Sequence, residues 1–274
     1  MIVIKTEKEI AVIRMGGKIL ANIIRKLVKE INPGITTGQL EQIACELIKK
    51  AGGVPSFKGY KSMLESKAFP TALCSSINNE VVHSPALPSR RLDSGDIIGI
   101  DLGMEYPVDI KSRQNRFGRY NSGGYFTDMA VTVGVGKIDS QSKKLIKVAK
   151  KSLELAIAQV KPGNTLDDIG RAVEDYVEKN GFSVVRDLVG HGVGMAVHEE
   201  PQVPNFSIKH SGIRNITLKP GMVIAIEPMV NAGAWEIKSL EDGFTIATAD
   251  GQRSAHFEHT VAVVEGGHKI LTEA

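Results

Sequence analysis

The sequence has little cysteine, no long apolar run and little net charge, and each shortage excludes a class of protein. Two cysteines in 274 residues cannot form a disulfide framework, so the cytoplasm is the expected location. The longest apolar stretches, 97–100 and 222–226, fall far short of the roughly 18 residues that a membrane-spanning helix needs. The chain becomes charged at Lys5 before an apolar segment develops, so we expect neither a secretory signal nor a membrane partner. A net charge of +3 does not by itself indicate a nucleic-acid partner.

The remaining composition is that of a folded globular domain. Hydrophobic residues make up 42% of the chain and charged residues 24%, which excludes a largely disordered chain or a fibre. Thr6 and Glu9 form a capping-box signature ahead of apolar residues that recur at steps of three and four, which predicts a first helix over 6–31. Similar signals predict helices from 36 or 37 to 50, at about 140–160 and at 166–180. Val- and Ile-rich runs predict strands at 97–102, 129–135, 222–226 and 260–264.

The two halves of the chain resemble each other. A Pro-Gly turn, a helix and a further glycine occur at 33–52 and again, about 130 residues later, at 162–181. A duplicated helix-and-strand unit indicates a pseudo-two-fold symmetric α/β (α+β) domain. We therefore predict one domain over 1–274 with two halves, about 5–135 and 140–272.

Four acidic residues occupy equivalent points of the two halves. Asp101 aligns with Glu227, each after an apolar strand, and Asp128 aligns with Glu258. Any one of them alone could be a strand-end acid that reaches solvent. A buried ionised carboxylate, however, is costly unless it is paired or binds a metal. If the four converge, cations must neutralise their repulsion, and an oxygen-rich site with one imidazole suits Mn, Fe, Co or Zn, which predicts two metal ions.

Three histidines are candidates for the same site. His191 lies between glycines that permit close backbone approach, while His83 and His198 each stand between a β-branched run and a proline-marked turn. Each alone could be an ordinary loop histidine. His256 and His259 flank the last of the four acids, and strand alternation predicts that they point to the other face, with supporting roles at most.

Taken together, these motifs resemble a known family. They are NEVVH at 79–83, ID at 100–101, TD at 127–128, GHGVG at 190–194, HEEPQV at 198–203, KPGM at 219–222, IEPMVNAG at 226–233 and FEHT at 257–260. From about residue 5 to 272 the chain is similar to the type I methionine aminopeptidases. The resemblance implies the pita-bread fold, with a central curved antiparallel sheet and helices packed on one side.

The resemblance also implies a ligand set and an activity. It assigns two divalent metal ions (Co, Mn, Fe or Zn) to Asp101, Asp128, His191, Glu227 and Glu258. Asp128 and Glu258 would bridge the ions, and Glu227 would also move the proton of the attacking water. His83 and His198 would contact the substrate. The implied reaction removes the initiator methionine from nascent proteins when the second residue is small, and the implied partners are peptides that begin with methionine.

For the methionine side chain the resemblance points to an apolar pocket. Its residues would be Phe69, Cys74, Val197 and Phe244. Phe244 replaces the tryptophan expected after Asp-Gly, and Val197 replaces a common aromatic residue, so the substrate preference could be shifted. Cys74 could equally be an ordinary core thiol.

A longer departure from the family lies at 105–124, where the expected hairpin is shorter. This insertion is basic and aromatic, and it could contact ribosomal RNA or could be a solvated hairpin tip. We expect the chain to be a monomer.

Two other functions are compatible with this kind of fold. One is a proline-directed aminopeptidase or prolidase-like enzyme, which normally carries a further N-terminal domain. The other is a non-catalytic binding module that has lost ligands. The presence of all five ligands and both histidines disfavours the binding module, and the IEPMVN motif at 226–231 favours methionine removal.

Overall fold

The computed structural model describes residues 1–61, 67–108, 113–114, 120–121, 123–209 and 211–273. Its helices are α1 (Glu7–Glu30), α2 (Thr37–Lys50), α3 (Ser140–Ala158) and α4 (Leu166–Lys179). Its strands are β1 (Val54–Pro55), β2 (Leu73–Ile77), β3 (Glu80–Val82), β4 (Ile97–Tyr106), β5 (Arg113–Gln114), β6 (Tyr120–Asn121), β7 (Tyr125–Gly134), β8 (Ser183–Val184), β9 (Gly190–Gly192), β10 (Glu199–Val203), β11 (Val223–Ile226), β12 (Met229–Asn231), β13 (Ile237–Ser239), β14 (Ile246–Thr248), β15 (Ser254–His256), β16 (His259–Val264) and β17 (Gly267–Ile270).

The four predicted helices are confirmed, and side-chain caps explain where they begin. Thr6 and Glu9 form the expected capping box at α1, and Thr36 forms an equivalent one at α2. Asp139 accepts the first-turn amide of α3, and the backbone N–H of Thr165 donates to Asp168 at the start of α4. Each cap satisfies backbone donors that the first helical turn leaves without partners. Among the described residues, no helix has the length and apolar character needed to cross a membrane.

The strands pair antiparallel throughout the described part of the chain. The first half contains β1-β4-β2, with β7 also paired to β4, and the second half contains the five-stranded sheet β10-β9-β11-β16-β17. Two three-stranded sheets, β15-β12-β8 and β13-β14-β3, and the β5-β6 pair complete the topology. All four predicted strand runs lie in β4, β7, β11 and β16.

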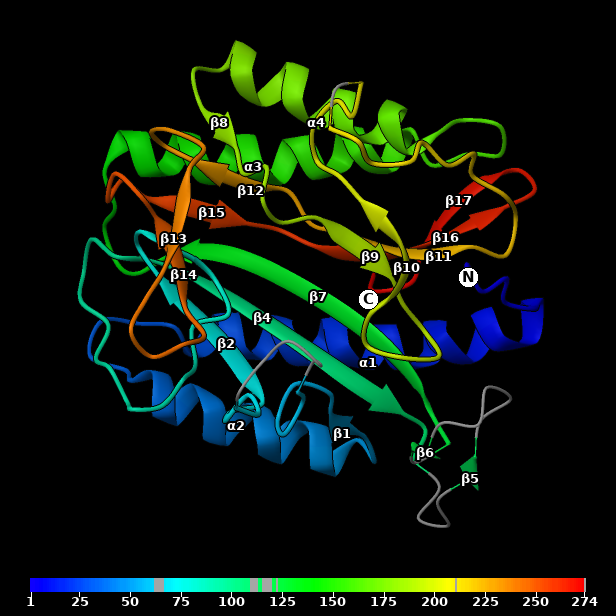
Figure 1. Ribbon diagram of the computed structural model, residues 1–274. Coiled ribbons are helices and arrows are strands. Elements are labelled where there is room, and N and C mark those ends of the chain that lie inside the picture. The colour runs from blue at the N-terminus through cyan, green and yellow to red at the C-terminus, as the bar shows by residue number, and fades with distance from the viewer. Residues whose placement is uncertain (62–66, 109–112, 115–119, 122, 210, 274) are drawn as a thin grey trace.

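The helices flank the strands as two pairs, α1 with α2 and α3 with α4 (Figure 1). Helix α1 packs against β7 and β4, and α3 packs against β15 and β12. One apolar core joins the first helix pair to β2 and β4, while a second joins α3 and α4 to β11 and β16. The pita-bread fold implied by the resemblance is therefore confirmed.

The repeat read from the sequence recurs in the backbone hydrogen bonds. In the first half, the Gly34 N–H donates to the carbonyl of Leu92 over 2.8 Å. In the second half, the Gly163 N–H donates to the carbonyl of Leu218 over 3.2 Å. In both halves the turn before the second helix is thus tied to the segment that leads into a central strand.

A row of hydrogen bonds joins the halves where β7 meets β15 and β16. The Thr260 hydroxyl donates to the carbonyl of Asp128 (2.8 Å) and accepts from its N–H (2.9 Å). The Thr132 hydroxyl makes the same two bonds, of 2.8 and 2.9 Å, with the backbone of His256. Between them, the N–H of Glu258 donates to a β7 carbonyl over 2.9 Å. This seam sets Asp128 and Glu258, one from each half, beside each other.

Half of the predicted insertion at 105–124 lies outside the described residues, which omit 109–112, 115–119 and 122. Within the described part, β5 and β6 pair antiparallel.

We predict that Thr260→Val destabilises the fold, because it removes the hydroxyl that satisfies two backbone groups of Asp128 while keeping the side-chain shape. Leaving buried polar groups unpaired should lower the free energy of unfolding by about 2–4 kcal/mol. Urea unfolding of the metal-free protein measures the effect. Thr217→Val, at an exposed threonine, is the matched control. Equal losses in the two variants would contradict the role of the seam.

Candidate metal centre and substrate cavity

The structure brings the five predicted ligands to one place from both halves of the fold. Each stands on, or just beyond, a strand of the two large sheets: Asp101 on β4, Asp128 on β7, His191 on β9, Glu227 after β11 and Glu258 between β15 and β16. Apolar strands surround these polar side chains, because Ile98, Ile100, Ile224 and Ile226 are fully buried.

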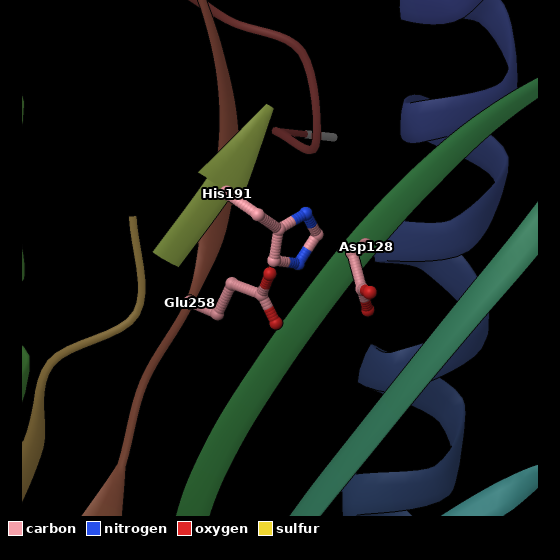
Figure 2. Close-up of side chains that lie close together, drawn as sticks. All are labelled: Asp128, His191 and Glu258. Atoms are coloured by element: carbon pink, nitrogen blue, oxygen red, sulfur yellow. The ribbon is translucent and has the colours of Figure 1, made fainter. Parts of the chain in front are cut away.

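Side chains from three of these strands converge most closely. Asp128, His191 and Glu258 each offer a ligand atom, and these atoms lie within 4.8 Å of one another (Figure 2). The Asp101 carboxylate lines the same cavity and repels that of Asp128. The Glu227 carboxylate lies 3.6 Å from Nε2 of His191. All five side chains therefore form one cluster.

The glycines beside His191 let its strand approach both neighbours. A Cβ at Gly190 would lie 2.4 Å from the carbonyl oxygen of Ala225, and one at Gly192 would lie 2.2 Å from that of Glu200. Both distances are far shorter than any real contact, so only glycine fits beside this histidine. The close packing fixes the position from which the imidazole reaches the cluster.

Burial and mutual repulsion shift the pKa values of the cluster in the direction expected without a cation. Burial raises the pKa of Asp101 to about 7. Burial and neighbouring carboxylates raise the pKa values of Asp128, Glu227 and Glu258 well above their ordinary range. Burial lowers the pKa of His191 to about 4, so its imidazole is neutral at pH 7, the form that binds metals.

The residues present fit a divalent-metal site. Among the described residues, Oδ1 of Asp101 and Oε1 of Glu258 are buried carboxylate oxygens with no hydrogen-bond partner. A buried carboxylate oxygen without a partner is costly, and a cation would satisfy it. Four carboxylates and one neutral imidazole form the donor set that first-row divalent metals accept.

The cluster forms part of the wall of a cavity of about 1070 Å³. His83 and His198 line this cavity, as do Phe69, Cys74 and Phe244 of the predicted apolar pocket. The Phe69 and Phe244 rings pack edge to face, with centroids 5.6 Å apart. A polar cluster and an aromatic pocket thus share one cavity.

Comparison with known proteins identifies the family. The model of metallopeptidase family M24 matches residues 11–265. The chain belongs to this family. The metallopeptidases of family M24 use divalent metal, in agreement with the ligand cluster.

Relatives in M24 match this chain over its whole length. It is 45% identical to methionine aminopeptidase 1 of Bacillus subtilis and 44% identical to a methionine aminopeptidase of Clostridium perfringens, over 99% of each chain in both cases. The crystal structure of methionine aminopeptidase from Thermotoga maritima superposes with a TM-score of 0.87, at 40% identity and over 100% of both chains. The resemblance read from the motifs is confirmed.

Other M24-like structures share the fold at lower identity. A prolidase of Pyrococcus horikoshii superposes with a TM-score of 0.72 at 22% identity, with 99% of this chain and 64% of that chain covered. This likeness shows a common fold.

Two sequence-based predictions need correction. Val197 is buried at 6% exposure and does not line the cavity, whereas its neighbours Ala196 and His198 do. His256 does not point away from the site, because its Nε2 lies 3.7 Å from Glu227. Strand alternation fails there since β15 ends at His256 and β16 begins at His259, leaving Glu258 in the break between them.

Sequence reasoning also missed residues of the cavity wall, among them Phe57, Tyr60 and Met195. The Tyr60 hydroxyl lies 2.8 Å from Nδ1 of His198, and the two rings pack edge to face. No periodicity marks Phe57 or Tyr60, which stand in the connection between β1 and β2. The available signal was three aromatic residues, Phe57, Tyr60 and Phe69, in one connection between strands, where binding residues are common.

We predict that divalent cations stabilise this protein more at pH 8 than at pH 5. At the four carboxyl groups, the raised pKa values mean that the metal-free folded state holds more protons than the unfolded state. The stability that Asp101 contributes in this way is fully present below its ordinary pKa of 3.8 and is lost as the pH rises through about 7. A bound cation removes this penalty.

Thermal unfolding at both pH values, with a chelator or with Mn²⁺, measures the shift. A cation-induced shift that is equal at both pH values, or smaller at pH 8, would contradict the carboxylate cluster as the binding site.

Proposed function

We propose that this chain removes the N-terminal methionine of newly made proteins by metal-assisted hydrolysis, preferring substrates with a small second residue. One observation carries the proposal: the five-residue cluster and an aromatic pocket occupy a single cavity in a chain whose full-length relatives are methionine aminopeptidases. The cluster supplies the means of hydrolysis, and the pocket supplies a place for the methionine side chain.

Asp101, Asp128, His191, Glu227 and Glu258 would hold two divalent ions between the two halves. When bound, such ions polarise the peptide carbonyl and lower the pKa of water toward neutrality. Which of Co, Mn, Fe or Zn serves in the cell depends on supply as well as affinity. Asp101 lines the cavity, so the free α-amine of the substrate would bind beside it and the ions. Binding there would restrict cleavage to the first residue.

Glu227 is proposed to move the proton. Its carboxylate lies between two imidazoles, 3.6 Å from His191 and 3.7 Å from His256. Its backbone carbonyl accepts a hydrogen bond from the Asn205 side chain over 3.1 Å, which fixes the turn after β11. From this position the carboxylate can take a proton from the attacking water and return it to the leaving amine.

His198 and His83 are proposed to bind the substrate. The His198 ring packs edge to face against the ring of His191, with centroids 4.4 Å apart, and Tyr60 fixes its Nδ1 side. The imidazole therefore stands beside the cluster, where it can donate a hydrogen bond to the oxyanion that develops on the substrate. His83 has a backbone φ of +58°, a strained angle for a non-glycine residue, which aims its side chain from the end of β3.

The methionine side chain is proposed to bind among Phe57, Phe69, Phe244 and Cys74. Phe69 packs edge to face with both other rings, 6.5 Å from Phe57 and 5.6 Å from Phe244 between centroids. A thioether makes favourable contacts with aromatic edges. Burial raises the pKa of the Cys74 thiol well above its ordinary value, so this cysteine serves as an apolar wall and not as a nucleophile.

The cytoplasm is the proposed site of action. Cys45 and Cys74 are both free thiols, the form that a reducing compartment maintains. Two of the expectations stay predictions. They are contact with the ribosome through 105–124 and a monomeric state.

We predict that the parent enzyme cleaves Met-Ala-Ser when Mn²⁺, Fe²⁺ or Co²⁺ is added and that a chelator abolishes cleavage. Met-Lys-Ser should be cleaved poorly because the second residue is large. Lys-Ala-Ser should not be cleaved, since an apolar pocket offers its charge no partner. Release of the first residue, followed by chromatography, measures each rate.

Similar rates on all peptides would indicate a general aminopeptidase and contradict the proposal. Preferential cleavage of Ala-Pro peptides would instead support the prolidase-like alternative.

We predict that His198→Ala retains metal but loses turnover, because the imidazole interacts with the substrate and not with the ions. Loss of one oxyanion donor should lower kcat by about 10²–10³. Steady-state kinetics and calorimetric metal titration measure the two properties. His268→Ala, at an exposed histidine on β17, is the control. Loss of metal binding in His198→Ala would show that the role is misassigned.

A further inference from the structure

The N-terminal segment reaches the cavity before α1 begins. Residues 1–4 line the cavity, and the N–H of Lys5 donates to the carbonyl of Gly221 over 2.7 Å. From there the Lys5 side chain runs inward, past Gly194, where a Cβ would lie only 3.0 Å from Cε of the lysine. The lysine is 3% exposed, which is unusual for an ammonium group and requires a partner.

That partner is Glu199, almost two hundred residues further along the chain. Nζ of Lys5 lies 2.6 Å from Oε2 of Glu199, and the two side chains are 1% and 6% exposed. Such a short, water-excluded pair is a charge-assisted hydrogen bond with a defined geometry. It is unlike Lys151–Glu154 on the surface of α3, where both side chains are about half exposed.

The second carboxylate oxygen of Glu199 binds backbone amides of the segment that precedes it. Oε1 accepts the N–H groups of Met195 and Ala196, the latter over 2.9 Å. The segment 194–199, here called the histidine loop, is thus closed by one carboxylate at its end. The same carboxylate binds Lys5 through its other oxygen. The loop is therefore held both by hydrogen bonds to its own amides and by the N-terminal segment.

The histidine loop carries a proposed substrate-binding group. His198 directly precedes Glu199, and Met195, Ala196 and His198 all line the cavity. The position of the His198 ring beside His191 and Tyr60 depends on the path of this short loop. Because only one peptide unit separates the two residues, a displacement of the Glu199 carboxylate will also displace His198.

We propose that Lys5 is a positioning residue for His198, acting through the Glu199 carboxylate that closes the histidine loop. The ammonium group orients the Glu199 carboxylate, and that carboxylate in turn binds the loop amides. The inference rests on the proposed function, because His198 binds substrate only there.

The test compares Lys5→Met with the parent enzyme on Met-Ala-Ser. A displacement of a catalytic group by about 1 Å can cost 100-fold in rate, so kcat should fall by about 10- to 100-fold, with KM little changed. Lys5→Arg, which keeps the charge, should recover part of the loss. Calorimetric titration with Mn²⁺ should give the parent affinity in both variants.

Hydrogen exchange of the metal-free protein reports the loop directly. The amides of Met195 and Ala196 should exchange faster in Lys5→Met, while those of α2 should not change. Glu199→Gln provides a second route, and a substitute if Lys5→Met fails to fold. Its neutral amide oxygen is a weaker acceptor, so it should also speed exchange and lower kcat.

Two control variants separate positioning from general stability. Ile48→Val reduces packing in α2, a helix that contributes no residue to the cavity wall, and Lys151→Met removes an exposed ion pair. Both should keep the parent kcat. A parent-like kcat in Lys5→Met and Glu199→Gln, or an equal loss in Ile48→Val, would overturn the proposal. If the parent enzyme cleaved no methionine peptide, the proposed function would fail, whereas unchanged exchange at Met195 and Ala196 would refute the positioning role by itself.

Discussion

The repulsion between buried carboxylates is the constraint on which the rest of this structure depends. Asp101, Asp128, Glu227 and Glu258 are held together among apolar strands, and burial raises their pKa values. A fold cannot keep such a cluster for stability alone, because hydrophobic residues would pack there at lower cost. The arrangement is favourable only when cations are bound. Metal binding therefore offsets the free-energy cost of burying the carboxylates together.

Both of the predicted halves of the chain contribute to this cluster. Each half contributes acids at equivalent points, and the seam between β7 and β16 brings the innermost acids together. The hydroxyls of Thr132 and Thr260 make most of the seam bonds, and the backbone N–H of Glu258 adds one more. The imidazole of His191 comes from β9. This strand can lie so close to its neighbours only because glycines stand on either side of the histidine. Three of the five side chains stand on strands, and Glu227 and Glu258 lie directly beside the ends of strands, so the strands set the geometry of the cluster.

Much of this could be predicted from the sequence, for identifiable reasons. The helices were predictable because capping residues and apolar periodicity agree, as at Thr6 and α1. The acids were predictable because charged residues within or beside apolar strands conflict with local composition, and the repeat in the sequence placed them in pairs. The cavity wall was harder: Tyr60 and Met195 lie in loops whose path depends on distant contacts. No local sequence pattern predicts the buried ion pair of Lys5 with Glu199, since the two residues meet only in the folded protein.

The central claim is that the five side chains form one centre for divalent metal, and crystallography with anomalous scattering tests it most directly. Crystals grown at neutral pH with Mn²⁺ and measured near the manganese edge would locate every bound ion. We expect two strong peaks between Asp101, Asp128, His191, Glu227 and Glu258, with Asp128 and Glu258 in contact with both. Strong peaks only at other places, with the five side chains empty between them, would contradict the account.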